Sequence, residues 1–126
     1  MNTLEIDIES YSDVDLKTCG TYRYAESENF ELLLLGVSVD GGPVTVYDPA
    51  SGDQIPDSII TALCDTTVTK WAHNAAFERI CLSAYLRRHY PLQFKSYVNP
   101  DDAVGNYLDP HGWKCTMILS AYNGLP

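Results

Sequence analysis

The sequence predicts an α/β fold in which helices flank the faces of a mixed β-sheet. Three strand patterns come first, at residues 4–10, 30–39 and 44–47. A fourth strand pattern, at 68–72, runs directly into a helical pattern that continues to about residue 89. Strands followed by an alternation of strand and helix are typical of a sheet covered by helices. The 126 residues are enough for one domain with a buried core.

The first strand, Leu4 to Ser10, alternates acidic and apolar residues. Side chains along a strand alternate between its two faces, so Asp7 and Glu9 share one face and the isoleucines share the other. Glu5 is on the acidic face too, nearer the start of the strand. Carboxylates spaced this way, about 6.5–7 Å along the backbone, can bind one hard cation or a pair about 3.5–4 Å apart. A strand with one solvated face shows the same alternation, so the pattern alone leaves metal binding open.

The next two strands follow from an apolar run and its turn. Residues 30–39 form a continuous apolar run, which predicts a strand buried on both faces. The turn residues 40–43 join it to the strand at 44–47 as a hairpin, and the first strand completes an antiparallel meander.

The segment before this hairpin is less regular. Residues 11–20 lack periodicity and indicate a loop or short helical turn. If residues 21–25 are extended, Tyr22 and Tyr24 share a face that is either a stacking platform for bases or, as we favour, a boundary between core and solvent.

Helical patterns dominate the second half of the chain. Asn74 is the predicted N-cap of the longest helix, which has one apolar stripe and which we expect to end before Pro91. The other expected elements are a helix at 58–64, a short helix within 100–109, a strand at 113–115 and a final helix at 117–122.

Charge is divided unevenly along the chain. Residues 1–65 hold thirteen acidic and two basic residues, whereas 66–126 hold four acidic and six basic ones. The net charge of −9 therefore does not exclude a nucleic-acid partner. No apolar stretch approaches the 18 or so residues of a membrane span, and the first residues lack a signal-peptide pattern. The four cysteines form no C-x-x-C pair, which argues against zinc.

Glu78 lies in the first turn of the longest helix. A carboxylate there gains about 0.3–1 kcal/mol from the helix dipole, which by itself explains its position. However, Asp7-x-Glu9 together with Asn74-x-x-Phe77-Glu78 resembles the first two motifs of the DEDD 3′→5′ exonucleases, which have an RNase H-like fold. Segments 16–22, 30–34 and 113–117 further resemble the proofreading exonuclease domain of bacteriophage and prophage family A DNA polymerases.

The resemblance implies an RNase H-like fold and hydrolysis of the 3′-terminal phosphodiester of DNA with two Mg²⁺ or Mn²⁺ ions. It implies that Asp7 bridges both ions and that Glu9 binds the ion carrying the attacking water. Glu78 would support the second ion, directly or through water.

The resemblance also implies substrate contacts and partners. Ser10 and Tyr11 are expected beside the terminal nucleotide, with Asn74 and Phe77 as further substrate-binding residues. Asn74 is equally explained as a helix cap and Phe77 as a core residue. The expected partners are the single-stranded 3′ end of DNA and a downstream polymerase domain of the same chain, and no membrane partner is expected. The expected location is the cytoplasm of a bacterial host.

Two departures from the family pattern affect these expectations. The second motif usually ends in Asp, and here it ends in Glu78, one methylene longer. The fourth acid of the family lies in a Y-x-x-x-D or H-x-x-x-x-D pattern, and neither occurs after Gly105. We therefore expect residues 1–126 to be an N-terminal, C-terminally truncated part of the exonuclease domain. With three of four acids, we expect weak metal affinity and little exonuclease activity.

Three alternatives stay open at this point. The chain is a degenerate nuclease fold acting as a scaffold, a stand-alone ribonuclease of the same superfamily, or a protein whose acids are merely solvated. Arg79, Arg87 and Arg88 either steer a phosphate backbone or, as we favour, form the solvated face of the longest helix.

Overall fold

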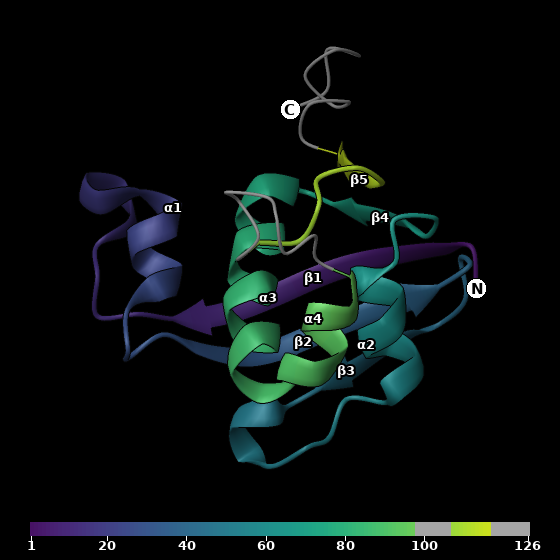
Figure 1. The fold of residues 1–126 in the computed structure, drawn as a ribbon, viewed down its shortest axis with the longest axis horizontal. Helices are drawn as coiled ribbons and strands as arrows, with labels where there is room; N and C mark the ends of the chain where they lie inside the picture. The colour runs from purple at the N-terminus through teal and green to yellow at the C-terminus, as the bar shows by residue number, and fades with distance from the viewer. Residues whose placement is uncertain (98–106, 117–126) are drawn as a thin grey trace.

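The computed structural model describes residues 1–97 and 107–116 (Figure 1). The expected final helix at 117–122 and most of the short helix within 100–109 lie outside these residues, and Tyr107 to Asp109 are not helical. The described elements are β1 (Thr3–Tyr11), α1 (Leu16–Glu26), β2 (Glu31–Val39), β3 (Val44–Tyr47), a short 3-10 helix η1 (Pro49–Ser51), α2 (Asp57–Cys64), β4 (Thr69–Ala72), α3 (Ala75–His89), α4 (Pro91–Tyr97) and β5 (Trp113–Cys115).

The five strands form one mixed sheet in the order β3-β2-β1-β4-β5. The meander β1–β2–β3 is antiparallel, whereas β4 lies parallel to β1 and β5 lies parallel to β4. A tight turn allows antiparallel neighbours, while parallel neighbours need a longer crossover connection. The predicted α/β architecture with a mixed sheet flanked by helices is confirmed, and it is consistent with an RNase H-like fold.

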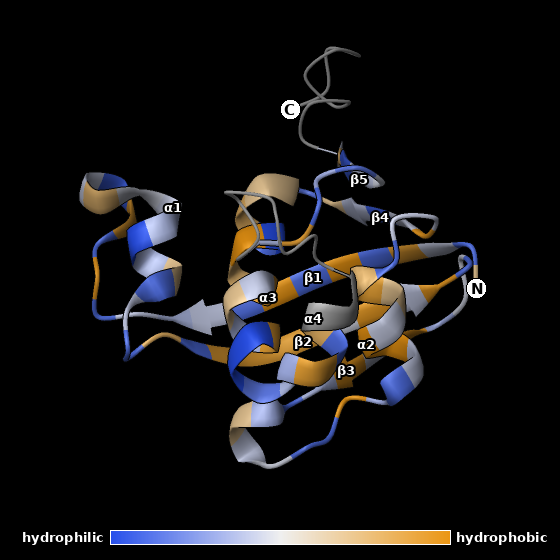
Figure 2. Ribbon diagram, in the orientation of Figure 1, coloured by the Kyte–Doolittle hydropathy of each residue, from blue (hydrophilic) through white to orange (hydrophobic). Residues whose placement is uncertain are grey.

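The core lies between one face of the sheet and the helices α2, α3 and α4, which are stacked against that face in Figure 1. The hydropathy colours of β1 alternate along the strand, as its burial does (Figure 2). The prediction that 30–39 is buried on both faces is wrong. Leu34 and Gly36 of β2 are only partly buried and line a cavity on the other side of the sheet. Antiparallel strands need only one covered face.

The segment for which the sequence indicates a loop or short helical turn, together with residues 21–25, forms the longer helix α1, which stands at the carboxyl end of β1 (Figure 1). Asp15 caps the helix, with its side chain accepting a hydrogen bond from the Lys17 backbone N–H at 3.1 Å. Gly20 has a φ of +83° and interrupts the helix, so no single apolar stripe runs along it. Tyr22 and Tyr24 therefore do not share an extended face.

The strand-to-helix unit in the second half of the chain is close to its prediction. The Asn74 side chain accepts a hydrogen bond from the Phe77 backbone N–H at 3.4 Å, as expected of an N-cap. α3 ends at His89, before Pro91, as predicted, and a further helix that the sequence did not predict, α4, begins at Pro91, a position that proline tolerates well. No helix in residues 1–97 or 107–116 is long and apolar enough to cross a membrane.

Candidate functional site

The candidate site lies beside β1 at the point where its parallel neighbour β4 ends. The ladder between the two strands ends with the pair Ile6 and Ala72, so Asp7 is the first residue of β1 beyond the end of β4. β1 continues past this point through Asp7, and the chain after β4 turns directly into α3. The first turn of α3 therefore carries Glu78 back towards Asp7. Carboxyl ends of neighbouring parallel strands are a common place for a functional site.

Glu78 is buried, with 6% of its surface exposed. Burial, and to a lesser extent the nearby charge of Asp7, together raise the pKa of its carboxyl group to about 8, while a backbone hydrogen bond from Ile8 acts in the opposite direction. Interaction with the helix dipole alone does not require a buried side chain, so it does not explain the burial of Glu78. The two carboxylates, 71 positions apart in the sequence, are thus close enough to repel each other.

One oxygen of this buried carboxylate has no protein partner. Glu78 Oε2 is inaccessible to solvent and accepts no hydrogen bond from any residue that the structure describes. An unsatisfied buried polar atom costs on the order of 1–3 kcal/mol, and more if it is charged. A divalent cation next to Asp7 and Glu78 would satisfy this oxygen and remove the repulsion. The pair therefore fits the oxygen ligands that Mg²⁺ and Mn²⁺ prefer.

Asp7 and Glu9 are exposed on the face of the sheet opposite the core. Both line a cavity of about 650 Å³. Gly36 of β2 pairs with Asp7, and a Cβ atom at this glycine would lie 3.5 Å from the Asp7 backbone oxygen and 4.0 Å from its Cβ. The glycine therefore leaves space beside Asp7. The other lining residues are Glu5, Ile6, Ile8, Leu34, Ser38, Val44, Val46, Trp71, Ala72, His73 and Thr116.

The structure brings two of the three predicted metal ligands into electrostatic contact. Asp7 and Glu78 interact, while Glu9 lies two residues further along β1 in the lining of the same cavity. Within residues 1–97 and 107–116, no group of three or more His, Cys, Asp or Glu side chains is close enough to hold a metal ion. A site built from all three carboxylates stays a prediction.

The four predicted substrate-binding residues all lie near the end of β1 or the start of α3. Tyr11 is 53% exposed, whereas the Ser10 hydroxyl lies 2.9 Å from the hydroxyl of Tyr24. Asn74 caps α3, and Phe77 packs against the core. Asn74 and Phe77 thus have the structural roles that the sequence left open. Contact of any of the four with a nucleotide stays a prediction.

Sequence reasoning missed two further residues of the cavity, Trp71 and His73. Trp71 pairs with Glu5 in the parallel register. His73 Nδ1 lies 3.3 Å from the Thr116 hydroxyl, and the backbone oxygen of His73 accepts a bond from the Cys115 thiol at 3.1 Å. The alternation of side chains in the strand predicted at 68–72 could have indicated both residues. Continued by one residue, it places residues 71 and 73 on the same face.

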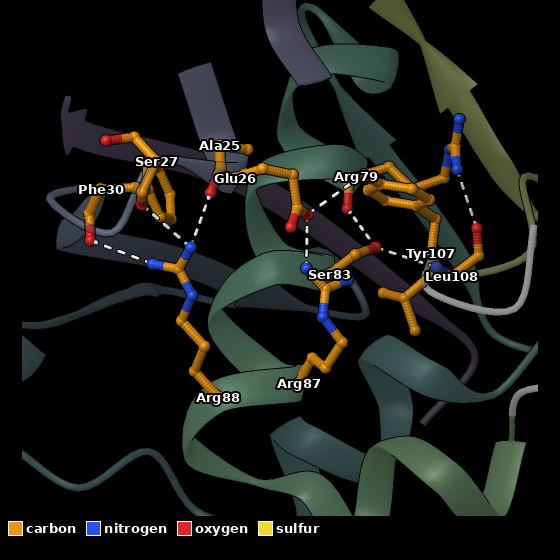
Figure 3. Close-up of polar contacts among 10 residues, drawn as sticks. All are labelled: Ala25, Glu26, Ser27, Phe30, Arg79, Ser83, Arg87, Arg88, Tyr107 and Leu108. Atoms are coloured by element: carbon orange, nitrogen blue, oxygen red, sulfur yellow. Dashed lines mark hydrogen bonds and ion pairs between the residues drawn. The ribbon is translucent and has the colours of Figure 1, made fainter. Parts of the chain in front are cut away.

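The arginines of α3 have partners within the protein, although Arg88 is exposed and Arg87 is partly exposed, as the favoured interpretation of a solvated face expects. Arg88 lies near the end of α3 and donates to three backbone carbonyl groups at the end of α1 and just after it. The same contacts occupy the guanidinium groups that phosphate steering would need. The partners are the carbonyl oxygens of Ala25, Ser27 and Phe30 for Arg88, the carboxylate of Glu26 for Arg87, and the carbonyl oxygen of Leu108 for Arg79 (Figure 3).

Comparison with known proteins points in the same direction as the motifs. The chain is 38% identical, over all 126 residues, to a DNA polymerase of Bacillus phage SP02. The aligned region covers the whole of this chain but only 17% of the length of that polymerase. No protein-family model matches the chain, and no solved structure matches it. The chain is thus similar throughout its length to one part of a phage DNA polymerase.

Proposed function

We propose that this chain is part of the 3′→5′ proofreading exonuclease domain of a phage-type DNA polymerase, a domain that hydrolyses the 3′-terminal phosphodiester of DNA. The observation that carries the proposal is the buried carboxylate of Glu78, with its unpaired Oε2, next to Asp7. A buried carboxyl group beside a second carboxylate is costly to ionise, and a bound cation would offset that cost. The similarity to a phage DNA polymerase supports a DNA substrate rather than another phosphodiester.

In the proposed reaction, Asp7, Glu9 and Glu78 hold two Mg²⁺ or Mn²⁺ ions. When bound, such a pair activates the attacking water and neutralises charge on the leaving oxygen. Asp7 and Glu9, on the exposed face of β1, and Glu78, buried on α3, are the residues that would hold the ions. The fixed position of Glu78 limits the ways in which the ions can be held, since α3 is anchored by its Asn74 cap.

The remaining residues of the proposed site orient the DNA. Tyr11 is exposed two residues beyond Glu9 and offers a ring on which the terminal base can stack. The cavity beside Asp7 admits the terminal nucleotide, because Gly36 has no side chain to fill it. The acidic surface keeps the phosphates away from Asp7 and Glu9 until the cations are bound, so DNA binding is expected to require the metal.

Residues 1–126 contain three of the four carboxylates that the family resemblance calls for. We therefore expect the chain by itself to bind Mn²⁺ weakly and to have little or no exonuclease activity. A scaffold role with the same fold is the second candidate. It is favoured by Glu78 in place of the usual Asp and by the lack of a three-ligand group among the described side chains.

Mn²⁺ titration by calorimetry, combined with digestion of a 3′-labelled single-stranded DNA, tests the proposal. Binding is expected for the wild-type chain and is expected to be lost in Asp7→Asn. Glu5→Gln is the matched control, because Glu5 is an exposed carboxylate on the same face of β1 but outside the proposed ligand set. Any digestion should begin at the 3′ end and stop in Asp7→Asn. Equal Mn²⁺ binding by wild type, Asp7→Asn and Glu5→Gln would refute the proposal and leave the scaffold role.

A further inference from the structure

The end of β1 is irregular next to the proposed ligands. Glu9 pairs with Leu34, but Ser10 pairs with Leu32, so β2 has one extra residue, Leu33, at this point. A bulge of this kind disrupts the hydrogen-bonded ladder locally and changes the twist of the strands. The regular pairing of β1 with β2 is therefore interrupted directly after Glu9.

Tyr24 of α1 holds this irregular strand end at two points. Its hydroxyl lies 2.9 Å from the Ser10 hydroxyl, and its backbone oxygen accepts a hydrogen bond from the Ser12 hydroxyl at 2.8 Å. The two serines flank Tyr11, so both side chains on one side of this strand end bind the same tyrosine. Because successive side chains of a strand point to opposite faces, fixing Ser10 also fixes the opposite direction for Glu9.

The ring of Tyr24 reaches the second acidic segment. Its centroid lies 5.7 Å from that of Phe77 and 5.9 Å from that of Phe30. Phe77 directly precedes Glu78 in the first turn of α3. One tyrosine therefore contacts the residue after Glu9 and the residue before Glu78.

Contacts with α3 and Tyr107 hold the carboxyl end of α1, which carries Tyr24, in place. Arg88 donates to the carbonyl oxygen of Ala25, the residue after Tyr24. Glu26 pairs with Arg87 and also accepts a hydrogen bond from the Tyr107 hydroxyl at 3.1 Å (Figure 3). Because α1 stands at the end of the sheet, these contacts determine where Tyr24 is placed.

We infer that Tyr24 is a positioning residue, which holds the end of β1 against α3 so that Glu9 faces the cavity that Asp7 also lines. The inference rests on the proposed function, since it concerns the ligands proposed there. Tyr24 acts through Ser10 and Phe77 and does not itself touch the cations or the DNA.

Mn²⁺ affinity and the melting temperature of the metal-free protein separate this role from a merely structural one. Tyr24→Phe removes the hydroxyl and keeps the ring, and Ser10→Ala removes its partner. Each is expected to weaken Mn²⁺ binding by about threefold to tenfold, at or below the lower limit of the roughly tenfold to hundredfold losses typical of residues that orient metal ligands. The double variant should be no weaker than either single one, because both remove the same contact. Melting temperatures should change by only a few degrees or less.

Tyr22→Phe is the matched control, because it removes a hydroxyl from the same helix at a residue that is 50% exposed and contacts Tyr107 rather than Ser10. Its Mn²⁺ affinity should equal that of the wild type. Wild-type affinity in both Tyr24→Phe and Ser10→Ala, with binding still abolished by Asp7→Asn, would overturn this inference and leave the proposed function standing. Mn²⁺ binding that does not depend on Asp7 would overturn both.

Discussion

The two halves of α3 differ in how their polar groups are satisfied. In the C-terminal half, Ser83, Arg87 and Arg88 all have partners, and these partners belong to α1 and to the segment at 107–108 as well as to α3 itself (Figure 3). In the first turn, Glu78 is buried with an oxygen that has no partner among the described residues, and it lies beside a second carboxylate.

This difference separates stability from function along one helix. Satisfied polar groups hold parts of the chain together, and their removal should only destabilise the protein. An unsatisfied buried carboxylate weakens the folded state, and such a group persists where a ligand supplies what the protein lacks. The sign of the stability change on substitution should therefore be opposite in the two halves.

The largest expected effect is in the C-terminal half, at Ser83. Its hydroxyl donates to the Arg79 carbonyl oxygen at 2.6 Å and accepts from the Leu108 backbone N–H at 2.8 Å, and the side chain is fully buried. Ser83→Ala leaves a buried N–H group without a partner and should lower the free energy of unfolding by about 2–3 kcal/mol. Urea unfolding at neutral pH measures this. The exposed Ser58 of α2 is the control, and Ser58→Ala should change stability by less than about 0.5 kcal/mol.

The opposite sign is expected in the first turn. Glu78→Gln keeps the shape of the side chain but removes its buried charge, and should stabilise the metal-free protein by about 1–2 kcal/mol above pH 8. The pKa of Glu78 is raised from 4.5 to about 8 on folding, so folding favours the protonated form. Glu78 therefore does not lower the free energy of unfolding of the wild type below about pH 4.5. Between there and pH 8 the free energy of unfolding falls as the pH rises.

Urea unfolding of wild type and Glu78→Gln between about pH 5 and 8.5 tests this linkage. The difference between the two proteins should be small at the acidic end, grow with pH and level off above about 8. Saturating Mn²⁺ should reverse the order, because only the wild type keeps the carboxylate that binds the ion. A stability difference that does not vary with pH would show that Glu78 is not in the environment described.

The smallest effect is expected from the ion pair between Arg87 and Glu26. Both side chains are partly exposed, at 25% and 40%, so water and salt screen their attraction. Arg87→Ala should lower stability by less than about 1 kcal/mol, and the loss should shrink further in 1 M salt. A loss as large as that of Ser83→Ala would mean that the ring of Tyr107, which lies 5.6 Å from the Arg87 guanidinium group, contributes more than the charge pair.

Local patterns predicted most of the architecture correctly. Alternation in β1, the turn at 40–43 and the Asn74 cap each depend on a few neighbouring residues, and the structure contains all three features. The failures lie where a local signal is interrupted or ambiguous. Gly20 breaks the period of α1, and Pro91 is compatible with both the end of one helix and the start of the next.

The arginines show a different limit of sequence reasoning. Arg87 and Arg88 lie in the last turn of α3, where basic residues are equally expected on an exposed face. No neighbouring residue in the sequence indicates which groups they contact. Those partners are about sixty residues away, at the end of α1. Only the packing of α1 against α3 brings these side chains within hydrogen-bonding distance of their partners.

The sequence by itself determined the acidic face of β1 and the helix that begins at Asn74, because both follow from the spacing of adjacent side chains. It also indicated the chemistry through the motifs that contain Asp7, Glu9 and Glu78. Only the tertiary structure decided that Glu78 is buried beside Asp7 with an oxygen left unpaired. That proximity depends on the parallel register of β1 and β4, which is set by long-range packing and not by any local pattern.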